Sequence, residues 1–131
     1  MIHGLGVDAV EIDRIRAACE RWGDRFLARV FTPEERADCA DRADPAPSLA
    51  ARFAAKEAAY KAVGTWTGPI SWRDLAVTHA PAGQPRLVLS SRARARCPLP
   101  GELRFHCALS HTARLALAAV VVETAPGATT G

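Results

Sequence analysis

Two acidic side chains and one lysine stand in this sequence at spacings that suit the binding of a metal and a phosphate group. Asp8 ends a short apolar stretch, and Glu57 and Lys61 lie four residues apart in an alanine-rich segment. Residues four apart share one face of a helix, so we expect Glu57 and Lys61 side by side. Two carboxylates bind a hard cation such as Mg²⁺, and a lysine offsets phosphate charge. This set favours metal-assisted attack on a phosphate or pyrophosphate.

Each of these groups also has a purely structural interpretation, which the sequence leaves open. Asp8 would serve equally well as the cap of a following helix. Glu57 and Lys61 would form an exposed ion pair worth only about 0.3–0.5 kcal/mol. Gly4 and Gly6 superficially resemble a dinucleotide-binding turn, but the third glycine is missing, so we reject that interpretation.

Further cations and a histidine extend the predicted phosphate-binding set. Arg52 lies at the edge of an apolar helical arc, and Lys56 falls within the arc, so its ammonium must snorkel, pair or meet an anion. His111 stands between the hydroxyl residues Ser110 and Thr112, a group suited to hydrogen bonds with phosphate or ribose oxygens. A solvent-exposed turn histidine is the structural alternative. A Ser–His nucleophile is discounted, because adjacent residues of a strand point to opposite faces.

The elements that must position these residues are mainly helical in the first half of the chain. The residue pattern predicts a strand at residues 2–10, helices at 11–22, around 26–31 and from 32, and a long central helix at 49–63. Thr32 is expected to cap one of these helices, with Pro33 and Glu35 behind it. Ser48 is expected to cap the central helix, and Gly64 to end it.

Strands dominate the second half of the chain, with a turn at residues 83–85. They are predicted at residues 70–79, 86–89, 103–110 and 114–123, while segment 90–96 is left open between helix and irregular structure. Helices followed by strands argue for an α+β fold rather than a doubly wound sheet. We expect one domain over residues 1–123 and a disordered tail over residues 124–131.

The composition is that of an ordinary single-domain globular protein. The chain has 131 residues, of which 49% are hydrophobic and 24% charged, and its net charge of +3 is too small to indicate nucleic-acid binding. No stretch approaches the roughly 20 apolar residues of a membrane span, and the N-terminus lacks the pattern of a secretory signal. Four widely scattered cysteines predict free thiols in a cytoplasmic protein.

Five motifs, in order, resemble those of the holo-acyl-carrier-protein synthases, the small single-domain 4′-phosphopantetheinyl transferases. The resemblance covers residues 4 to 122, and its motifs are Gly6–Ile15, Arg52–Thr65, Ile70–Asp74, Gly83–Leu87 and Leu109–Thr112. Together these motifs are highly specific, whereas each alone is weak. The implied fold is an antiparallel sheet packed on a long central helix.

The resemblance also implies the chemistry. Asp8 and Glu57 would hold Mg²⁺, which also grips the pyrophosphate of coenzyme A, and Lys61 would stabilise the leaving 3′,5′-ADP. A serine hydroxyl of apo-acyl carrier protein attacks the β-phosphate, and phosphopantetheine is transferred to it. The base is either Glu57 or a metal-bound water.

The resemblance also implies which residues bind coenzyme A and how many subunits assemble. Arg52 and His111 would bind the nucleotide half of coenzyme A, and Gly64, Pro85 and Ser110 would line the same pocket. The family is similarly trimeric, so we expect a homotrimer with active sites between subunits, near which Lys56 would lie.

The acidic carrier protein that the resemblance implies has a natural docking surface on the first helix. Arg14 and Arg21 lie about 20° apart on one helical stripe, and Arg25 joins them only if the helix continues past Gly23. Such a stripe would steer an acidic partner and raise its association rate, without touching coenzyme A. Solvated surface arginines are the structural alternative.

One residue departs from the family pattern, and two other functions remain open. The family usually continues the central helix with Gly-Thr-Gly, whereas Trp66 follows Gly64 and Thr65 here, which implies a reshaped loop. The alternative functions are another metal-dependent phosphate or pyrophosphate hydrolase and a non-catalytic coenzyme-A-binding module.

Overall fold

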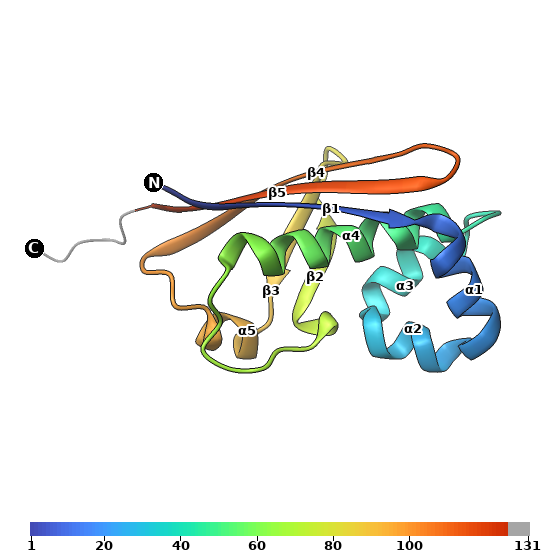
Figure 1. Cartoon of the computed structure of the whole chain (residues 1–131), viewed down its shortest axis with the longest axis horizontal. Helices are drawn as coiled ribbons and strands as arrows, with labels where there is room; N and C mark the ends of the chain where they lie inside the picture. Colours follow the sequence, from blue (N-terminus) through green and yellow to red (C-terminus); the bar gives the residue numbers. More distant parts are fainter. Residues whose placement is uncertain (126–131) are drawn as a thin grey trace, which may run out of the picture.

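A long helix packed under a three-stranded sheet is the central feature of the computed structural model, which describes residues 1–125 (Figure 1). The sheet is antiparallel with the strand order β1-β5-β4, and a second sheet pairs β2 with β3. The elements are β1 (Ile2–Glu11), α1 (Ile12–Trp22), α2 (Asp24–Val30), α3 (Pro33–Ala40), α4 (Ala46–Val63), the 3₁₀ turn η1 (Trp72–Asp74), β2 (Leu75–His79), β3 (Pro85–Leu89), α5 (Ser91–Arg96), β4 (Glu102–His111) and β5 (Leu115–Ala125).

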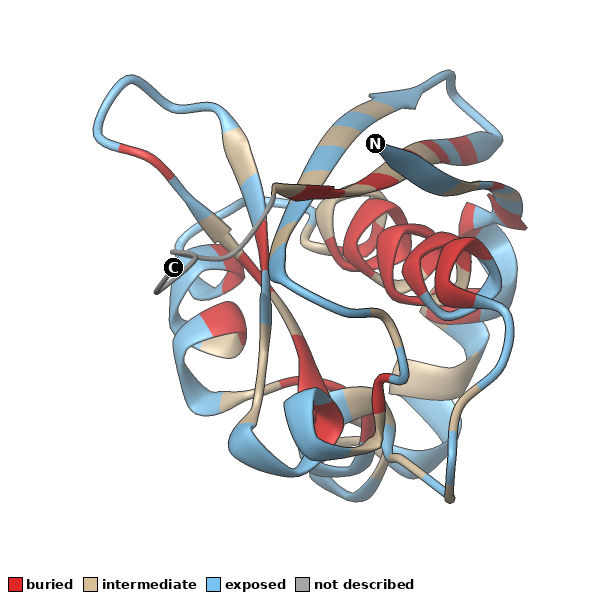
Figure 2. Ribbon diagram, turned by 90° about the vertical axis from the view of Figure 1, so that its left-hand side faces the viewer, coloured by how far each residue is buried: buried red, intermediate tan, exposed pale blue. Residues whose placement is uncertain are grey.

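Helix α4 forms the middle of the core because alanine lets it pack closely on several sides. Its alanines are buried, and Figure 2 shows the helix as an almost continuously buried coil beneath the sheet. Alternate residues of β5 face it: Ala116, Ala118, Val120 and Val122 are all buried. No helix within residues 1–125 has the length and apolar character needed to span a bilayer.

Two glycines of β1 allow α4 to lie close against that strand. A Cβ atom added at Gly4 would lie 1.8 Å from the carbonyl oxygen of Ala62, and one at Gly6 would lie 1.8 Å from that of Ala58. A side chain at either position would therefore push the helix away from the sheet. Asp8 is the next residue on the same face of β1, so this close packing brings its carboxylate to α4.

A buried ion pair fixes α4 to its other neighbours. Lys56 Nζ lies 2.6 Å from Glu35 Oε1 and also donates to the carbonyl oxygens of Trp72 and Leu75. Glu35 in turn accepts a hydrogen bond from the backbone N–H of Val77. Lys56 thus finds its anion within the same chain, and it gives no support to the subunit interface that the sequence analysis placed near it.

Most boundaries match the sequence-based prediction, and the Thr32 cap of α3 is confirmed by reciprocal hydrogen bonds with Glu35. Helix α4 begins three residues earlier than predicted, so Ser48 lies inside it and is not its cap. Gly64 follows the last residue of α4 with a φ of 83°, as expected for the residue that ends a helix.

The predicted strand at 70–79 was too long, because residues 72–74 form η1 and the strand begins at Leu75. The ambiguous segment 90–96 contains the helix α5. At the other end, Thr124 and Ala125 belong to β5 and not to the predicted tail, whose remaining residues 126–131 lie outside those described.

Candidate active site

The structure brings Asp8, Glu57 and Lys61 together, as the sequence predicted. Asp8 lies on the helix-facing side of β1, and Glu57 and Lys61 lie one turn apart on α4. Lys61 Nζ donates to Asp8 Oδ1 at 3.0 Å. The side chain of Asp8 is only 18% exposed, whereas that of Lys61 is 53% exposed. The carboxylate is therefore held in place, and the ammonium is able to move.

The electrostatics of this cluster favour a cation between the two carboxylates. Burial raises the pKa of Glu57, the negative charge of Asp8 raises it further, and Lys61 acts in the opposite direction. The repulsion between the carboxylates would be relieved by a hard cation bound through their oxygens. Within residues 1–125, no three His, Cys, Asp or Glu side chains lie close enough together to hold a metal ion.

Asp8 and Glu57 line a cleft of about 370 Å³ between β1, α1, α2 and α4. Arg14 of α1 and the aromatic rings of Phe26 and Phe53 complete its walls. The cleft therefore joins two carboxylates and one guanidinium to an apolar floor, an arrangement that suits a phosphorylated ligand carrying an apolar part.

A second group of predicted residues lies in a different pocket of the same chain. Arg52 and His111 line a pocket of about 390 Å³, together with His79, which the sequence analysis missed. His79 ends β2, and nothing in its sequence surroundings distinguishes it from any strand-end histidine. Neither Asp8 nor Glu57 lines this pocket. The predicted metal-binding residues on the one hand, and Arg52 and His111 on the other, therefore line separate pockets of one chain.

Arg52 is built into the wall of the second pocket and has spare hydrogen-bonding capacity. Its Nη1 donates to Ser48 Oγ at 2.8 Å, and its Nη2 lies 3.5 Å from Asp38 Oδ2. Its Nε is buried and has no partner among residues 1–125. A buried, unpaired N–H of a guanidinium is costly, and the positive charge of Arg52 would attract an anion to the pocket that it lines.

The other predicted residues divide between the two locations. Gly64 directly follows the end of α4, close to Lys61. Pro85 pairs across the β2–β3 sheet with His79, which lines the second pocket. Ser110 is exposed, and it pairs with the exposed Leu117 on the outer face of the three-stranded sheet. Its neighbours Leu109 and His111 line the second pocket within one chain, and the assignment of Ser110 to that pocket stays a prediction.

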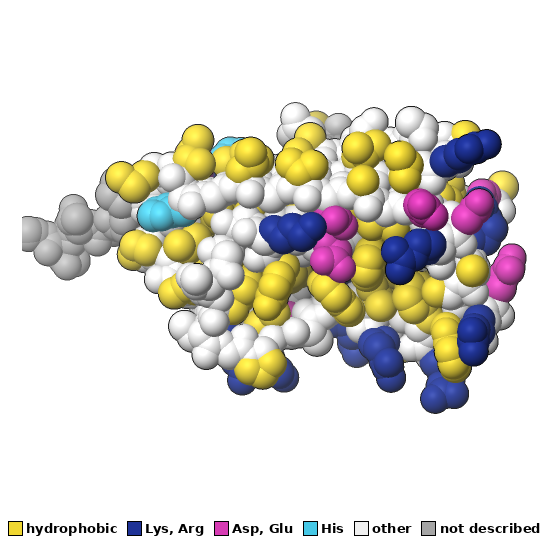
Figure 3. Space-filling view, viewed as in Figure 1, with side chains coloured by type: hydrophobic (Ala, Val, Ile, Leu, Met, Phe, Trp, Pro, Cys, Tyr) yellow, Lys and Arg dark blue, Asp and Glu magenta, His cyan; other side chains and the backbone are white. Residues whose placement is uncertain are grey.

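Both arginines of the predicted docking surface lie on α1, but in different surroundings. Arg14 reaches the cleft, whereas Arg21 lies at the end of the helix with its guanidinium 4.8 Å from the ring centre of Trp22. Arg25 and Arg29 follow on α2, and all four arginines are exposed. Figure 3 shows basic side chains gathered over the lower right of the molecule, where α1 and α2 lie.

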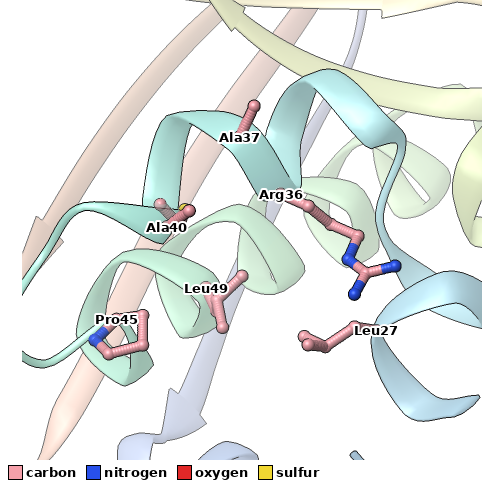
Figure 4. Close-up of a pocket in the computed structure, with 7 residues that line it drawn as sticks. Leu27, Arg36, Ala37, Ala40, Pro45 and Leu49 are labelled. Carbon is pink, nitrogen blue, oxygen red and sulfur yellow. The ribbon is translucent and has the colours of Figure 1, made fainter. Parts of the chain in front are cut away.

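A third cavity, shown in Figure 4, is a poor candidate for catalysis. It has a volume of about 300 Å³ and lies between α2, α3 and the start of α4. Its lining is apolar apart from Arg36, whose guanidinium is paired with Asp24 at 2.7 Å. None of the predicted site residues lines it.

Comparison with known proteins agrees with this geometry. A protein from Koribacter versatilis is 44% identical over 94% of this chain and 99% of its own length, and one from Methylobacterium sp. (strain 4-46) is 48% identical over 94% and 95%. Both are holo-[acyl-carrier-protein] synthases.

Solved structures of the same enzyme are similar in fold. The Neisseria meningitidis structure has a TM-score of 0.80 at 34% identity over 95% of this chain and all of its own. The Helicobacter pylori structure, a complex with coenzyme A, has a TM-score of 0.77 at 31% identity. The match covers 91% of this chain and 99% of that one. These matches confirm the fold that the resemblance implied. The family model of the 4′-phosphopantetheinyl transferase superfamily matches residues 4–119, and this chain therefore belongs to that superfamily.

Proposed function

We propose that this protein transfers 4′-phosphopantetheine from coenzyme A to a serine of an apo-acyl carrier protein, with Mg²⁺, and releases 3′,5′-ADP. The observation that carries the proposal is that Asp8 and Glu57 line one cleft and that Lys61 bonds to Asp8. It supplies the charges that phosphoryl transfer from a pyrophosphate needs. The relatives are holo-[acyl-carrier-protein] synthases, and one similar structure is a complex with coenzyme A.

Asp8 and Glu57 fit the role of the protein ligands to Mg²⁺. Both are oxygen donors at one cleft, and the negative charge of Asp8 raises the pKa of Glu57. A cation between the two carboxylates would relieve that repulsion. Mg²⁺ is usually held by one or two carboxylates, with waters and substrate phosphates as its other ligands. When bound, it would neutralise charge on the pyrophosphate oxygens.

The transfer itself exchanges one phosphorus–oxygen bond for another. The serine oxygen of the carrier bonds to the phosphorus next to the pantetheine, and the bond from that phosphorus to the bridging oxygen breaks. The bridging oxygen leaves with 3′,5′-ADP, and the serine proton passes to Glu57 or to water. Lys61, which is half exposed, would turn from Asp8 to the phosphate and stabilise the leaving charge.

The second pocket would bind the nucleotide half of coenzyme A. Arg52 and His111 both line this pocket, and a guanidinium and an imidazole suit an anion such as the 3′-phosphate. Because this pocket and the Asp8–Glu57 cleft are separate within one chain, one substrate would reach both if two subunits contributed to each site.

A homotrimer with shared active sites would meet that requirement. The outer face of the three-stranded sheet carries exposed apolar side chains, among them Leu5 (63% exposed) and Val7 (57%) on β1 and the less exposed Leu115 and Leu117 on β5. Figure 3 shows a row of hydrophobic side chains along the upper edge of the molecule, where this sheet lies. A contiguous apolar surface of this kind is typical of a subunit interface.

One incubation tests the activity directly. The protein, an apo-acyl carrier protein, coenzyme A and Mg²⁺ are combined, and the carrier is weighed by mass spectrometry. We expect the carrier to gain the mass of one phosphopantetheine, with one 3′,5′-ADP released for each carrier modified. Release of 3′,5′-ADP without any carrier would identify a hydrolase instead, and binding of coenzyme A without turnover would identify a non-catalytic module.

A further inference from the structure

The third cavity, between α2, α3 and the start of α4, takes no part in the chemistry described above. Its volume of about 300 Å³ lies at the lower end of the range for small-molecule sites, so its ligand would be small. Leu27, Ala40, Pro45 and Leu49 are among its apolar lining, and Arg36 is its one charged lining residue. A single charge in an apolar cavity indicates a ligand that is apolar over most of its length and charged at one end.

The charge and the apolar surface are separated along the cavity. Figure 4 shows the guanidinium of Arg36 next to Leu27 on one side of the view and Pro45 on the other, with Leu49 between them. An unbranched chain could therefore lie along Leu49 while its charged end meets Arg36. A ligand with its charge in the middle of the chain would not match this arrangement.

Arg36 is able to bind a second carboxylate beside the one it already contacts. Its Nη2 donates to Asp24 Oδ1 at 2.7 Å, which is the one side-chain hydrogen bond that the structure shows for Arg36 among residues 1–125. The side chain of Asp24 is 90% exposed and that of Arg36 is 35% exposed, so the ion pair is weak. A guanidinium has five N–H donors, so a further carboxylate would gain hydrogen bonds without displacing a strong contact.

Two contacts between α3 and α4 hold the walls of the cavity in place. The thiol of Cys39, a lining residue, donates to Ser48 Oγ at 3.5 Å. Glu35 of α3 and Lys56 of α4 form the buried ion pair already described. The two helices are therefore fixed relative to each other before a ligand binds, which reduces the entropy lost on binding.

We propose that this cavity binds a medium-chain carboxylate, an unbranched apolar chain that ends in one negative charge. The carboxylate would accept hydrogen bonds from the guanidinium of Arg36, and the chain would be buried against Leu27 and Leu49. The inference does not depend on the proposed function, because this cavity shares no lining residue with the Asp8–Glu57 cleft or with the second pocket.

The test titrates the full chain with hexanoate, octanoate and octanamide by isothermal calorimetry, below the concentrations at which micelles form. We expect one octanoate per chain. Each buried CH₂ group increases affinity about fourfold, so octanoate should bind roughly 15-fold more tightly than hexanoate. Octanamide has the same length but no charge, and it should bind about tenfold more weakly than octanoate.

Charge variants test the contact with Arg36. Arg36→Gln should weaken octanoate binding about tenfold and leave octanamide binding nearly unchanged. Arg86→Gln makes the same change at an exposed position of β3 and is the matched control. Asp24→Asn removes the carboxylate that competes for Arg36, so it should strengthen octanoate binding, whereas Asp13→Asn, at an exposed position of α1, should not.

A filling variant tests the position of the chain. Ala40 is exposed and lines the cavity, so Ala40→Trp should occupy the space without disturbing the core and should weaken octanoate and octanamide alike by at least tenfold. Ala17→Trp adds the same ring at an exposed alanine of α1, outside the cavity lining, and should bind both ligands as the wild type does.

Three results would overturn the proposal. Equal affinities for octanoate and octanamide would remove the argument from charge. Octanoate affinity that is unchanged in both Arg36→Gln and Ala40→Trp would place the ligand elsewhere. Competition between octanoate and coenzyme A would place it in the second pocket, which Arg52 lines. A protein that binds octanoate as expected but transfers no phosphopantetheine would contradict the proposed function alone and would support this site.

Discussion

Lys61 forms an ion pair with Asp8, a residue that lines the cleft, with 3.0 Å between Nζ and Oδ1. The contact joins a half-exposed cation on α4 to a largely buried carboxylate on β1. An ion pair with one exposed partner is weak, so little free energy is lost when the ammonium moves to a phosphate oxygen. The ion pair therefore keeps the Lys61 ammonium beside the place where the proposed reaction would need it.

The two carboxylates should be separately essential. We expect Asp8→Ala and Glu57→Ala each to lower Mg²⁺-dependent transfer by roughly 10²–10³-fold, because each removes one of two protein ligands to the cation. Circular dichroism should show an unchanged fold. Glu34→Ala, which removes an exposed carboxylate from α3, is the matched control and should retain full activity. Near-wild-type turnover by either variant at saturating coenzyme A would remove that residue from the proposed metal site.

Shared active sites predict that two inactive variants restore each other. Asp8→Ala lacks one carboxylate of the cleft, and His111→Ala lacks one side chain of the second pocket. A mixed trimer would contain some sites in which the cleft and the second pocket are both intact. Random mixing in equal amounts should return up to about a quarter of the wild-type activity. The subunits are coexpressed with different tags, and light scattering gives the oligomeric state. A fully active monomer, or a mixture no more active than its parents, would contradict the shared site.

The Asp8 cluster was predictable from local spacing in the sequence. The division of the other residues between two pockets was not, because it depends on long-range packing. Helical spacing places Glu57 beside Lys61, and a strand ending near Asp8 needs only to pack on that helix. Gly4 and Gly6 carried a further signal, because glycines in a strand mark a close backbone approach, here to α4. Which residues meet across a pocket depends instead on which face of each strand packs inward. Local spacing does not reveal this, and His79 of the second pocket has no distinguishing signal in the sequence around it.

Local hydrogen bonding accounts for the elements that the sequence misplaced. Residues 70–74 alternate like a strand, but the Asp74 carboxylate accepts from the N–H of Ser71 and closes a 3₁₀ turn. Ser48 has the right chemistry for a cap, yet its hydroxyl accepts from Arg52 inside a helix that starts earlier. In both cases a local side-chain hydrogen bond replaces the strand or the helix start that the residue pattern predicts.

The buried Lys56–Glu35 pair should dominate the cost of substitution on α4. Lys56→Met leaves the Glu35 carboxylate buried without its cation, and we expect the free energy of unfolding to fall by about 3–5 kcal/mol. Lys61→Met, on the same helix, breaks only a half-exposed pair and should cost less than about 1 kcal/mol. Urea denaturation measures both. Equal losses in the two variants would show that the burial of Lys56 contributes nothing to its cost.

Asp74 should make stability depend on pH in the acid range. Burial opposes its ionisation, but hydrogen bonds from Ser71 and Ser90 and the charge of Arg92 outweigh burial and hold its pKa below the ordinary 3.8. A depressed pKa stabilises the fold above the unfolded value, and this stabilisation is lost as the pH falls through the folded value.

The substitution Asp74→Asn should therefore lower the free energy of unfolding at pH 7 by about 1–3 kcal/mol. The gap from the wild type should close as the pH falls below 3.8, the ordinary pKa of the group. Asp41→Asn, at an exposed position after α3, is the control and should show no gap. Unfolding by urea across this pH range gives both curves, and a gap that stays constant with pH would contradict the depressed pKa.

Arg14 and Arg21 should differ in what they do for the carrier. Arg21 does not line the cleft, so Arg21→Glu should raise the KM for an acidic carrier at low salt and leave the KM for coenzyme A unchanged. The defect should shrink as salt rises, because the Debye length falls from about 10 Å at 0.1 M to about 3 Å at 1 M. Arg14 lines the cleft, so Arg14→Glu tests whether it serves the carrier alone. Titrating both substrates at two salt concentrations decides: a salt-insensitive defect in the KM for coenzyme A would assign Arg14 to the nucleotide, and a defect that shrinks with salt would assign it to docking.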